Sequence, residues 1–191
     1  MGRLRQIKRQ RRTQLDLHEL FNIFSAVEAT AGVRGDTAEV GVYEGGSAKV
    51  IAEFKGPRHL HLCDTFEGIP ELGKHDSREQ FYRGQYAASI ESVRAYLSGF
   101  MDLSFHKGLF PSPANSMYNK QFSFVNLDVD LYDSTLASLE FFYPRLAKGG
   151  ILISHDYSTC AGVKRAFDEF FDIKPEPVIA LCGSQCLVVK L

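Results

Sequence analysis

Residues that can do chemistry follow four separate apolar runs of the sequence. They are Gly45, Asp64, Asp128, Asp130, His155 and Asp156. A carboxylate can take a proton from a hydroxyl or hold a metal ion, and a glycine loop lets a ligand approach the bare backbone. Because the carboxyl ends of parallel strands meet at one edge of a sheet, these groups are expected at one rim. We predict a ligand site there, with Asp128 and Asp130 as candidate catalytic residues.

The glycine loop spans residues 39–47. An apolar run precedes it and an amphipathic segment follows it, which predicts a strand, a tight turn and the start of a helix. The N-terminus of such a helix offers unpaired N–H groups. Asp64 follows Gly45 by about 20 residues, the spacing at which an acid meets ribose hydroxyls in nucleotide-binding folds. The loop therefore predicts a site for a nucleoside-bearing cofactor.

Strands and helices are predicted to alternate along most of the chain. The predicted strands cover residues 37–43, 59–64, 103–107, 122–130, 151–154, 177–181 and 186–190, and the predicted helices cover residues 17–27, 48–54, 90–97, 136–146 and 163–171. This alternation predicts an α/β fold with three layers, in which helices cover both faces of a Rossmann-like, mostly parallel sheet. The last two strands are close in sequence, so they are expected to pair antiparallel as a C-terminal hairpin.

The chain is expected to have two parts, a basic arm with a covering helix over residues 1–35 and a cofactor-binding domain over residues 36–191. The arm carries Arg3, Arg5, Lys8, Arg9, Arg11 and Arg12. Such a charge run predicts a solvated, partly frayed segment, and the alternative is an arm that contacts a partner subunit or an anionic substrate.

Two connections also carry predictions. The polar stretch after Asp64, which runs to about residue 89, is long enough to be a functional loop or lid. Asp133-Ser134-Thr135 provides side chains that commonly cap a helix N-terminus, so the next helix is expected to begin there.

The loop at residues 39–47 resembles the acidic-x-G-x-G-x-G loop of class I S-adenosylmethionine-dependent methyltransferases. Glu39, Gly41 and Gly45 match this pattern, and Tyr43 stands at the middle glycine. Under this resemblance the cofactor is S-adenosyl-L-methionine, Asp64 matches the acid that holds the ribose hydroxyls, and the terminal hairpin is typical of the fold. The residues expected to contact the cofactor are Glu39, Gly41, Val42, Tyr43, Glu44, Gly45, Ser47, Asp64, Thr65, Phe66 and Gly108.

Four ordered blocks narrow the resemblance, at residues 39–47, 64–70, 127–135 and 143–157. Together they resemble the macrocin O-methyltransferase family, whose members methylate sugar hydroxyls on natural products, several of them with a divalent metal. The resemblance implies a metal held by Asp128 and by the pair His155 and Asp156, where the family's metal-dependent members have two acids. Imidazole suits softer ions than magnesium, so the presence and the identity of the ion stay open.

The function implied by this resemblance is methyl transfer to a hydroxyl of a sugar-like or polyhydroxylated small molecule. Asp128 is the expected metal ligand and general base, and Asp130 is the second candidate because strand alternation places it on the same side. Two other functions stay open. Asp128-Val129-Asp130 also resembles the D-x-D of metal-dependent nucleotide-sugar glycosyltransferases, which leaves the glycine loop unexplained. The third is a non-catalytic module that binds S-adenosylmethionine.

Composition limits the partners that are expected. The net charge of −1 gives no reason to expect nucleic acid as a partner, and no apolar run is long enough to span a membrane. The N-terminus has no apolar signal core, and the four cysteines do not form a disulfide framework, so a cytoplasmic protein is expected. A homo-oligomer formed through the N-terminal region is left open.

Overall fold

The predicted strands form one seven-stranded sheet in the computed structural model, which describes residues 1–191. The strands are β1 (Asp36–Val40), β2 (Leu60–Asp64), β3 (Leu103–Lys107), β4 (Phe122–Leu127), β5 (Leu146–Ser154), β6 (Ile179–Ala180) and β7 (Cys186–Val189), in the order β3-β2-β1-β4-β5-β7-β6. Strands β1 to β5 are parallel, and β7 pairs antiparallel with both β5 and β6. The predicted fold class and its C-terminal hairpin are confirmed.

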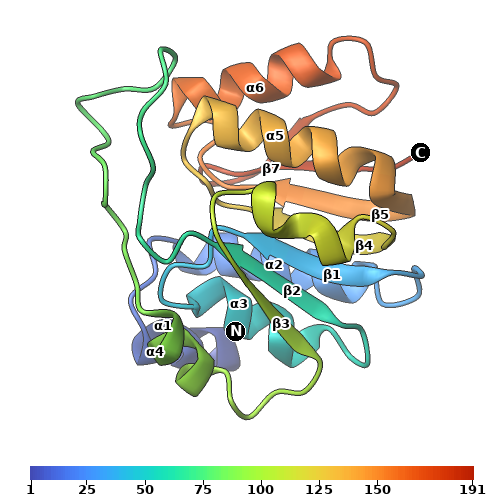
Figure 1. The fold of residues 1–191 in the computed structure, drawn as a ribbon. Helices are drawn as coiled ribbons and strands as arrows, with labels where there is room; N and C mark the ends of the chain where they lie inside the picture. Colours follow the sequence, from blue (N-terminus) through green and yellow to red (C-terminus); the bar gives the residue numbers. More distant parts are fainter.

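Helices cover both faces of this sheet (Figure 1). One face carries α1 (Gly2–Gln10), α2 (Leu17–Ala29), α3 (Gly46–Phe54) and α4 (Ile90–Tyr96), and the other carries α5 (Tyr132–Phe142), α6 (Ala161–Phe171) and the 3-10 turns η1 (Ser112–Met117) and η2 (Tyr143–Arg145). Each face has its own apolar core. Phe124 packs with the helices of the first face, whereas Phe122 and Phe142 pack with those of the second. The sheet is therefore buried on both sides, as its apolar runs require.

The basic N-terminal arm differs from the prediction of a frayed segment. Residues 2–10 form α1, in which Leu4 and Ile7 are buried against α2 and α3. Their spacing of three residues places them on one face of the helix, and the cationic side chains occupy the rest of its surface. The apolar pair fixes this segment to its own chain, and a homo-oligomer through this region stays a prediction.

The helix after β4 also differs from the prediction at both ends. It begins after Leu131, and no side chain of the Asp133-Ser134-Thr135 cluster caps it. It ends at Phe142 rather than near residue 146, because Pro144 lacks an N–H and restricts the residue before it. The chain then enters β5 earlier than the sequence predicted, at Leu146.

A long segment between β2 and α4 crosses the rim of the sheet (Figure 1). Its two limbs are joined near Ile69, whose N–H donates to the carbonyl of Gln85 and whose carbonyl accepts from Gly84. Asp76 attaches it to α5, because one carboxylate oxygen accepts from the N–H of Tyr132 at 2.8 Å and the other from Gly73 at 2.9 Å. This crossing segment, residues 65–89, lies where the sequence predicted a functional loop or lid.

Candidate active site

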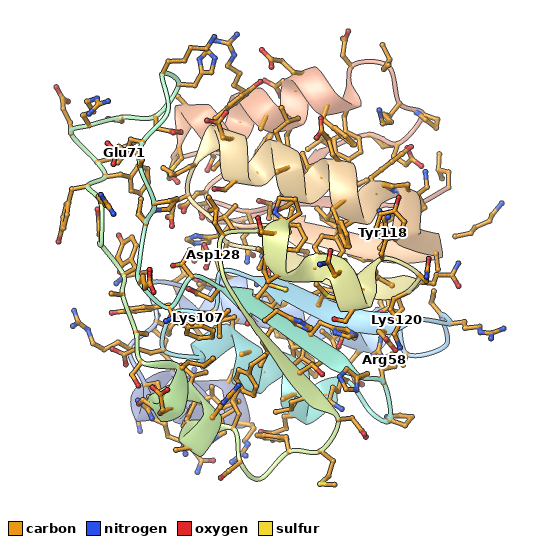
Figure 2. All side chains as sticks on the ribbon, viewed as in Figure 1. Arg58, Glu71, Lys107, Tyr118, Lys120 and Asp128 are labelled. Carbon is orange, nitrogen blue, oxygen red and sulfur yellow. The ribbon has the colours of Figure 1, made fainter.

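A cavity of about 590 Å³ opens at the carboxyl ends of β1, β2, β4 and β5. The strand order reverses between β1 and β4, which is where open parallel sheets bind ligands. Figure 2 places Asp128 at this rim and Glu71 out on the crossing segment. The volume falls within the range of small-molecule sites. From the predicted set, the cavity is lined by Gly41, Val42, Tyr43, Ser47, Asp64, Thr65, Gly108, Asp128, Asp130, His155 and Asp156.

Backbone hydrogen bonds bring the strand ends together. The N–H of Asp128 donates to the carbonyl of Val40 at 2.8 Å, and the N–H of His155 donates to Leu127 at 2.9 Å. Gly41 turns the chain out of β1 with a φ of 85°, and a side chain there would lie 1.7 Å from the carbonyl oxygen of Asp128. Only glycine allows this close approach, so Gly41 places the loop directly against the backbone of Asp128.

Asp64 fixes the loop that follows β1. One of its carboxylate oxygens accepts from the N–H groups of Val42 and Tyr43 at 2.6 and 2.9 Å, and the other accepts from Phe66 at 2.6 Å. The loop then leads into α3, whose first residues, Gly46 and Ser47, line the cavity. The first N–H groups of a helix are free to bind an anionic ligand group.

Four residues expected to contact the cofactor do not line the cavity, namely Glu39, Glu44, Gly45 and Phe66. Glu39 is fully buried, and its Oε1 accepts from the side chain of Asn126 at 2.9 Å. Burial raises the pKa of Glu39 to about 8. The carboxylate of Glu44 instead accepts from the N–H of Arg12.

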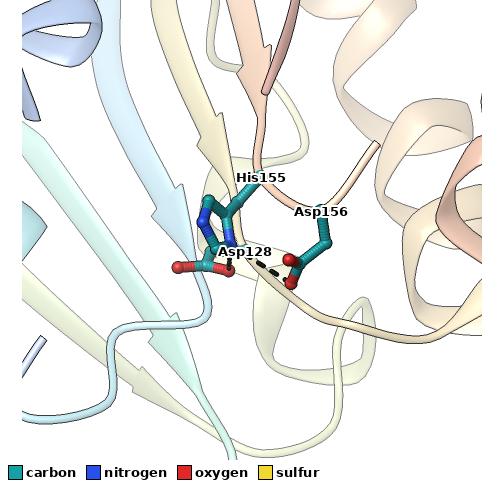
Figure 3. Close-up of side chains that lie close together, drawn as sticks. All are labelled: Asp128, His155 and Asp156. Carbon is teal, nitrogen blue, oxygen red and sulfur yellow. Dashed lines mark ion pairs between the residues drawn. The ribbon is translucent and has the colours of Figure 1, made fainter. Parts of the chain in front are cut away.

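Asp128, His155 and Asp156 converge within the cavity (Figure 3). Nδ1 of His155 lies 3.1 Å from a carboxylate oxygen of Asp128 and 3.1 Å from one of Asp156. One potential ligand atom from each residue lies within 4.8 Å of the other two. The sequence predicted this grouping, and the structure brings it together.

Burial and charge shift the pKa values of this cluster. Burial raises the pKa of Asp130 well above its usual range, and the charges of Asp128 and Asp156 raise it further. Burial acts to lower the pKa of His155, but the neighbouring carboxylates outweigh it and the net shift is upward. Burial acts to raise the pKa of Asp156, yet the imidazole of His155 lowers it overall. The cluster therefore favours a positive charge between the carboxylates of Asp128 and Asp156.

Cavity residues also adopt an uncommon backbone conformation. Tyr43, Tyr86, Asp130 and Asp156 have φ values between 48° and 63°, in the left-handed region. Each costs on the order of 1 kcal/mol for a residue with a side chain. All four line the cavity, so surrounding structure holds them in place at the site.

Sequence reasoning missed Glu19 and the segment before it. Residues 12–16 and Glu19 line the cavity from the first face of the sheet. Oε2 of Glu19 lies 3.3 Å from Nε2 of His155, on the side of the ring opposite Asp128 and Asp156. The signal in the sequence was the spacing of Asp16 and Glu19, which is that of a capping box, and the structure forms this box as well.

The sequence was compared with protein families, and residues 10–179 match the model of the TylF macrocin-O-methyltransferases. The chain belongs to this family. The match covers the glycine loop, the acidic cluster and the N-terminal residues that line the cavity, 12–16 and Glu19.

Two curated relatives of this macrocin-O-methyltransferase family member come from Streptomyces. An 8-demethyl-8-(2,3-dimethoxy-alpha-L-rhamnosyl)-tetracenomycin-C 4'-O-methyltransferase of Streptomyces olivaceus is 34% identical, over 76% of this chain and 62% of the relative. A demethyldecarbamoylnovobiocin O-methyltransferase of Streptomyces niveus is 30% identical, over 86% of this chain and 70% of the relative. The chain thus spans less than two thirds of the length of the first relative.

Solved structures agree with the family assignment. The O-methyltransferase NovP superposes with a TM-score of 0.80 at 27% identity, over 93% of this chain and 81% of NovP. An O-methyltransferase from Bacillus cereus, solved with S-adenosylhomocysteine, has a TM-score of 0.68 at 14% identity, over 100% of this chain and 91% of that chain, which shows a shared fold. None of the helices combines the length and the apolar character that crossing a bilayer requires.

The cluster of Asp128, His155 and Asp156 has a donor set that fits a divalent ion. Nδ1 of His155 is buried without a well-aligned hydrogen bond, although two carboxylate oxygens lie beside it. Ligand atoms at right angles around an ion, each about 2.1 Å from it, lie about 3 Å apart. The observed separations of 3.1 Å match that spacing, so Asp128, His155 and Asp156 are suited to hold an ion together.

Proposed function

We propose that the chain is an S-adenosylmethionine-dependent O-methyltransferase that acts on a hydroxyl of a sugar-like or polyhydroxylated small molecule. The observation that supports it is one cavity in which the glycine loop and Asp64 face the acidic cluster across the rim. Membership of the macrocin-O-methyltransferase family supports the reaction type. The names of the two relatives give a rhamnosyl-tetracenomycin and demethyldecarbamoylnovobiocin as their acceptors, and the rhamnosyl group supports a glycosylated natural product as acceptor here.

The cofactor is proposed to lie along the ends of β1 and β2. Asp64 would accept a hydrogen bond from a ribose hydroxyl through Oδ1, which has one lone pair left beside its bond from Phe66, whereas Oδ2 already accepts from Val42 and Tyr43. The N-terminus of α3 would receive the carboxylate of the methionine part. Tyr43, Thr65 and Gly108 line the adjoining wall.

The acceptor is proposed to enter beside the acidic cluster. Its hydroxyl oxygen would attack the methyl carbon, the carbon–sulfur bond would break, and the sulfur would keep that electron pair. Holding the oxygen, carbon and sulfur in line supplies much of the rate. Asp128 would take the hydroxyl proton as general base, and Asp130, which lines the same cavity, is the second candidate for that role.

A divalent ion held by Asp128, His155 and Asp156 would lower the pKa of an acceptor hydroxyl and orient it. Removing metal with a chelator is expected to lower kcat strongly without changing the affinity for S-adenosylhomocysteine. Activity should return with manganese, cobalt or zinc more readily than with magnesium, since one ligand is imidazole. Full activity in chelator would contradict the metal-assisted form of the reaction.

The Asp128→Asn variant tests the proposed function. It is expected to lower methyl transfer by roughly 100-fold or more, because the amide cannot act as a base. Calorimetry should show unchanged binding of S-adenosylhomocysteine. The exposed Asp133 lies outside the cavity, and Asp133→Asn is the matched control.

The assay uses isotope-labelled S-adenosylmethionine with a panel of glycosylated small molecules and nucleotide sugars. Cofactor binding with no transfer to any acceptor would favour a binding module. Binding of a nucleotide sugar with manganese, but not of S-adenosylhomocysteine, would instead indicate a glycosyltransferase.

A further inference from the structure

The carboxylate of Glu19 is held by donors on each of its oxygens. Oε1 accepts from the N–H of Ser184 at 2.9 Å and from its hydroxyl at 2.8 Å. Oε2 accepts from the N–H of Asp16 at 2.9 Å and lies 3.3 Å from Nε2 of His155. Only 7% of the Glu19 side chain is exposed. A buried carboxylate with these neighbours acts as an acceptor alone.

Both ring nitrogens of His155 face carboxylate oxygens, Nε2 that of Glu19 at 3.3 Å and Nδ1 those of Asp128 and Asp156 at 3.1 Å. An ion held by Asp128 and Asp156 would take the lone pair of Nδ1 in place of a proton, and the remaining ring hydrogen would then stay on Nε2, facing Glu19. Nδ1 has no aligned hydrogen bond of its own, although the two carboxylates lie beside it. A lone pair on Nδ1 would point to the same place as the two carboxylates, which is the arrangement of a carboxylate–histidine–metal triad.

The turn between β6 and β7 is built to approach Glu19 closely. Gly183 has a φ of 93°, and a side chain there would lie 2.8 Å from Oε1 of Glu19. Glycine at this position lets Ser184 reach Glu19 with both its N–H and its hydroxyl. Two elements far apart in the sequence, α2 and the C-terminal hairpin, thus fix the carboxylate behind His155.

We propose that Glu19 is a positioning residue that holds His155 with the hydrogen on Nε2 and so presents Nδ1, together with Asp128 and Asp156, to a divalent ion. The mixed nitrogen and oxygen ligands favour manganese, iron, cobalt, nickel or zinc over magnesium and calcium. The proposal rests on the metal-assisted form of the proposed function. It concerns binding and tautomer, which are measured without methyl transfer.

The Glu19→Gln variant tests this role. The amide oxygen can still accept from Ser184, which turns the amide NH₂ toward Asp16 and His155. An NH₂ group facing Nε2 favours the opposite tautomer, with the hydrogen on Nδ1. Cobalt affinity, followed by visible absorption of the bound ion, is expected to fall by about 10 to 100-fold. Glu176→Gln is the matched control, because Glu176 is another buried carboxylate, bonded to Tyr143 and Lys190 away from the cavity.

Nitrogen NMR of the zinc-loaded wild-type chain gives a second readout that needs no variant. The expected spectrum has a hydrogen on Nε2 of His155 and zinc on Nδ1. Zinc on Nε2, His155 outside the coordination sphere, or equal cobalt affinity in wild type and Glu19→Gln would overturn the proposal. Failure of the wild type to bind cobalt, manganese or zinc at millimolar concentration would overturn it as well. Binding of S-adenosylhomocysteine, measured on the same samples, reports separately on the proposed cofactor site.

Discussion

Glu39 is a glutamate without solvent contact at the centre of the sheet. One of its oxygens accepts from Asn126, and the other is buried without a partner. The sequence placed this residue at the cofactor, but it lies behind the loop and outside the cavity. Burial disfavours the charged form, which explains a pKa raised to about 8.

The Glu39→Gln variant should change how stability depends on pH. Between pH 4.5 and 8 the unfolded chain loses the Glu39 proton that the folded chain keeps. The contribution of Glu39 to the free energy of unfolding is therefore full below pH 4.5, and it is lost as pH rises through 8. Glutamine has no such proton. The variant is expected to match the wild type in Tm near pH 5 and to exceed it near pH 8.5, by a free energy on the order of a few kcal/mol.

Thermal unfolding at the two pH values measures this difference. Glu140→Gln, on the exposed face of α5, controls for the removal of a charge. A Tm difference that is the same at both pH values would contradict the assignment of a neutral Glu39.

The convergence of Asp128, His155 and Asp156 could be predicted because it follows from strand direction. Asp128 comes directly after β4, His155 and Asp156 are the first two residues after β5, and parallel strands end at one rim. Glu19 could not be predicted in this way. Its partners Ser184 and His155 are more than a hundred residues away, and its local spacing already has a sufficient explanation as a capping box.

At the scale of elements, α5 begins with a cap supplied by another part of the chain. Asp76 accepts from the N–H of Tyr132, whereas the adjacent Asp133 caps nothing. Sequence patterns identify caps that lie next to a helix, so a cap supplied by a distant loop leaves no local signal. The strands could be predicted more fully, because apolar runs between turn residues mark them directly.

The Asp76→Ala variant should loosen the crossing segment and destabilise α5. Loss of a helix cap costs about 1 kcal/mol, and the bond to Gly73 is lost with it. Thermal unfolding should show a lower Tm, and limited proteolysis should cut within residues 65–89 faster than in the wild type. Asp133→Ala is expected to change neither the Tm nor the rate of cleavage. Equal effects of the two variants would contradict the assignment of Asp76 as the cap of α5.

At the scale of the whole molecule, the N-terminal segment joins the outer helix layer to the cavity. The side chain of Ile7 is fully buried on the inner face of α1, and residues 12–16 continue from this helix into the cavity wall. A side chain at Gly46 would lie 2.9 Å from Thr13, so the start of α3 is shaped to receive this segment. The helical spacing of Leu4 and Ile7 is present in the sequence, but the basic residues around them predicted a solvated, partly frayed segment instead of a packed helix.

The Ile7→Ala variant should therefore affect stability and ligand binding together. Removing this buried side chain is expected to cost about 2–4 kcal/mol, since it leaves a cavity under α1. Looser packing of residues 12–16 should weaken S-adenosylhomocysteine binding, which calorimetry measures below the Tm of the variant. Arg5→Ala, on the exposed side of α1, is the control. Unchanged S-adenosylhomocysteine binding in Ile7→Ala would show that the packing of α1 does not influence the cavity.

The contact between Glu19 and Ser184 also bears on the order of folding during synthesis. Glu19 is made early, but a nascent chain has no Ser184 to hold it until translation has passed residue 184. Contacts of such sequence separation form late, because loop closure must precede them. The proposed ion site at Asp128, His155 and Asp156 should form only once the C-terminal hairpin has emerged from the ribosome and docked, so newly made chains would be protected from loading metal before their fold is complete.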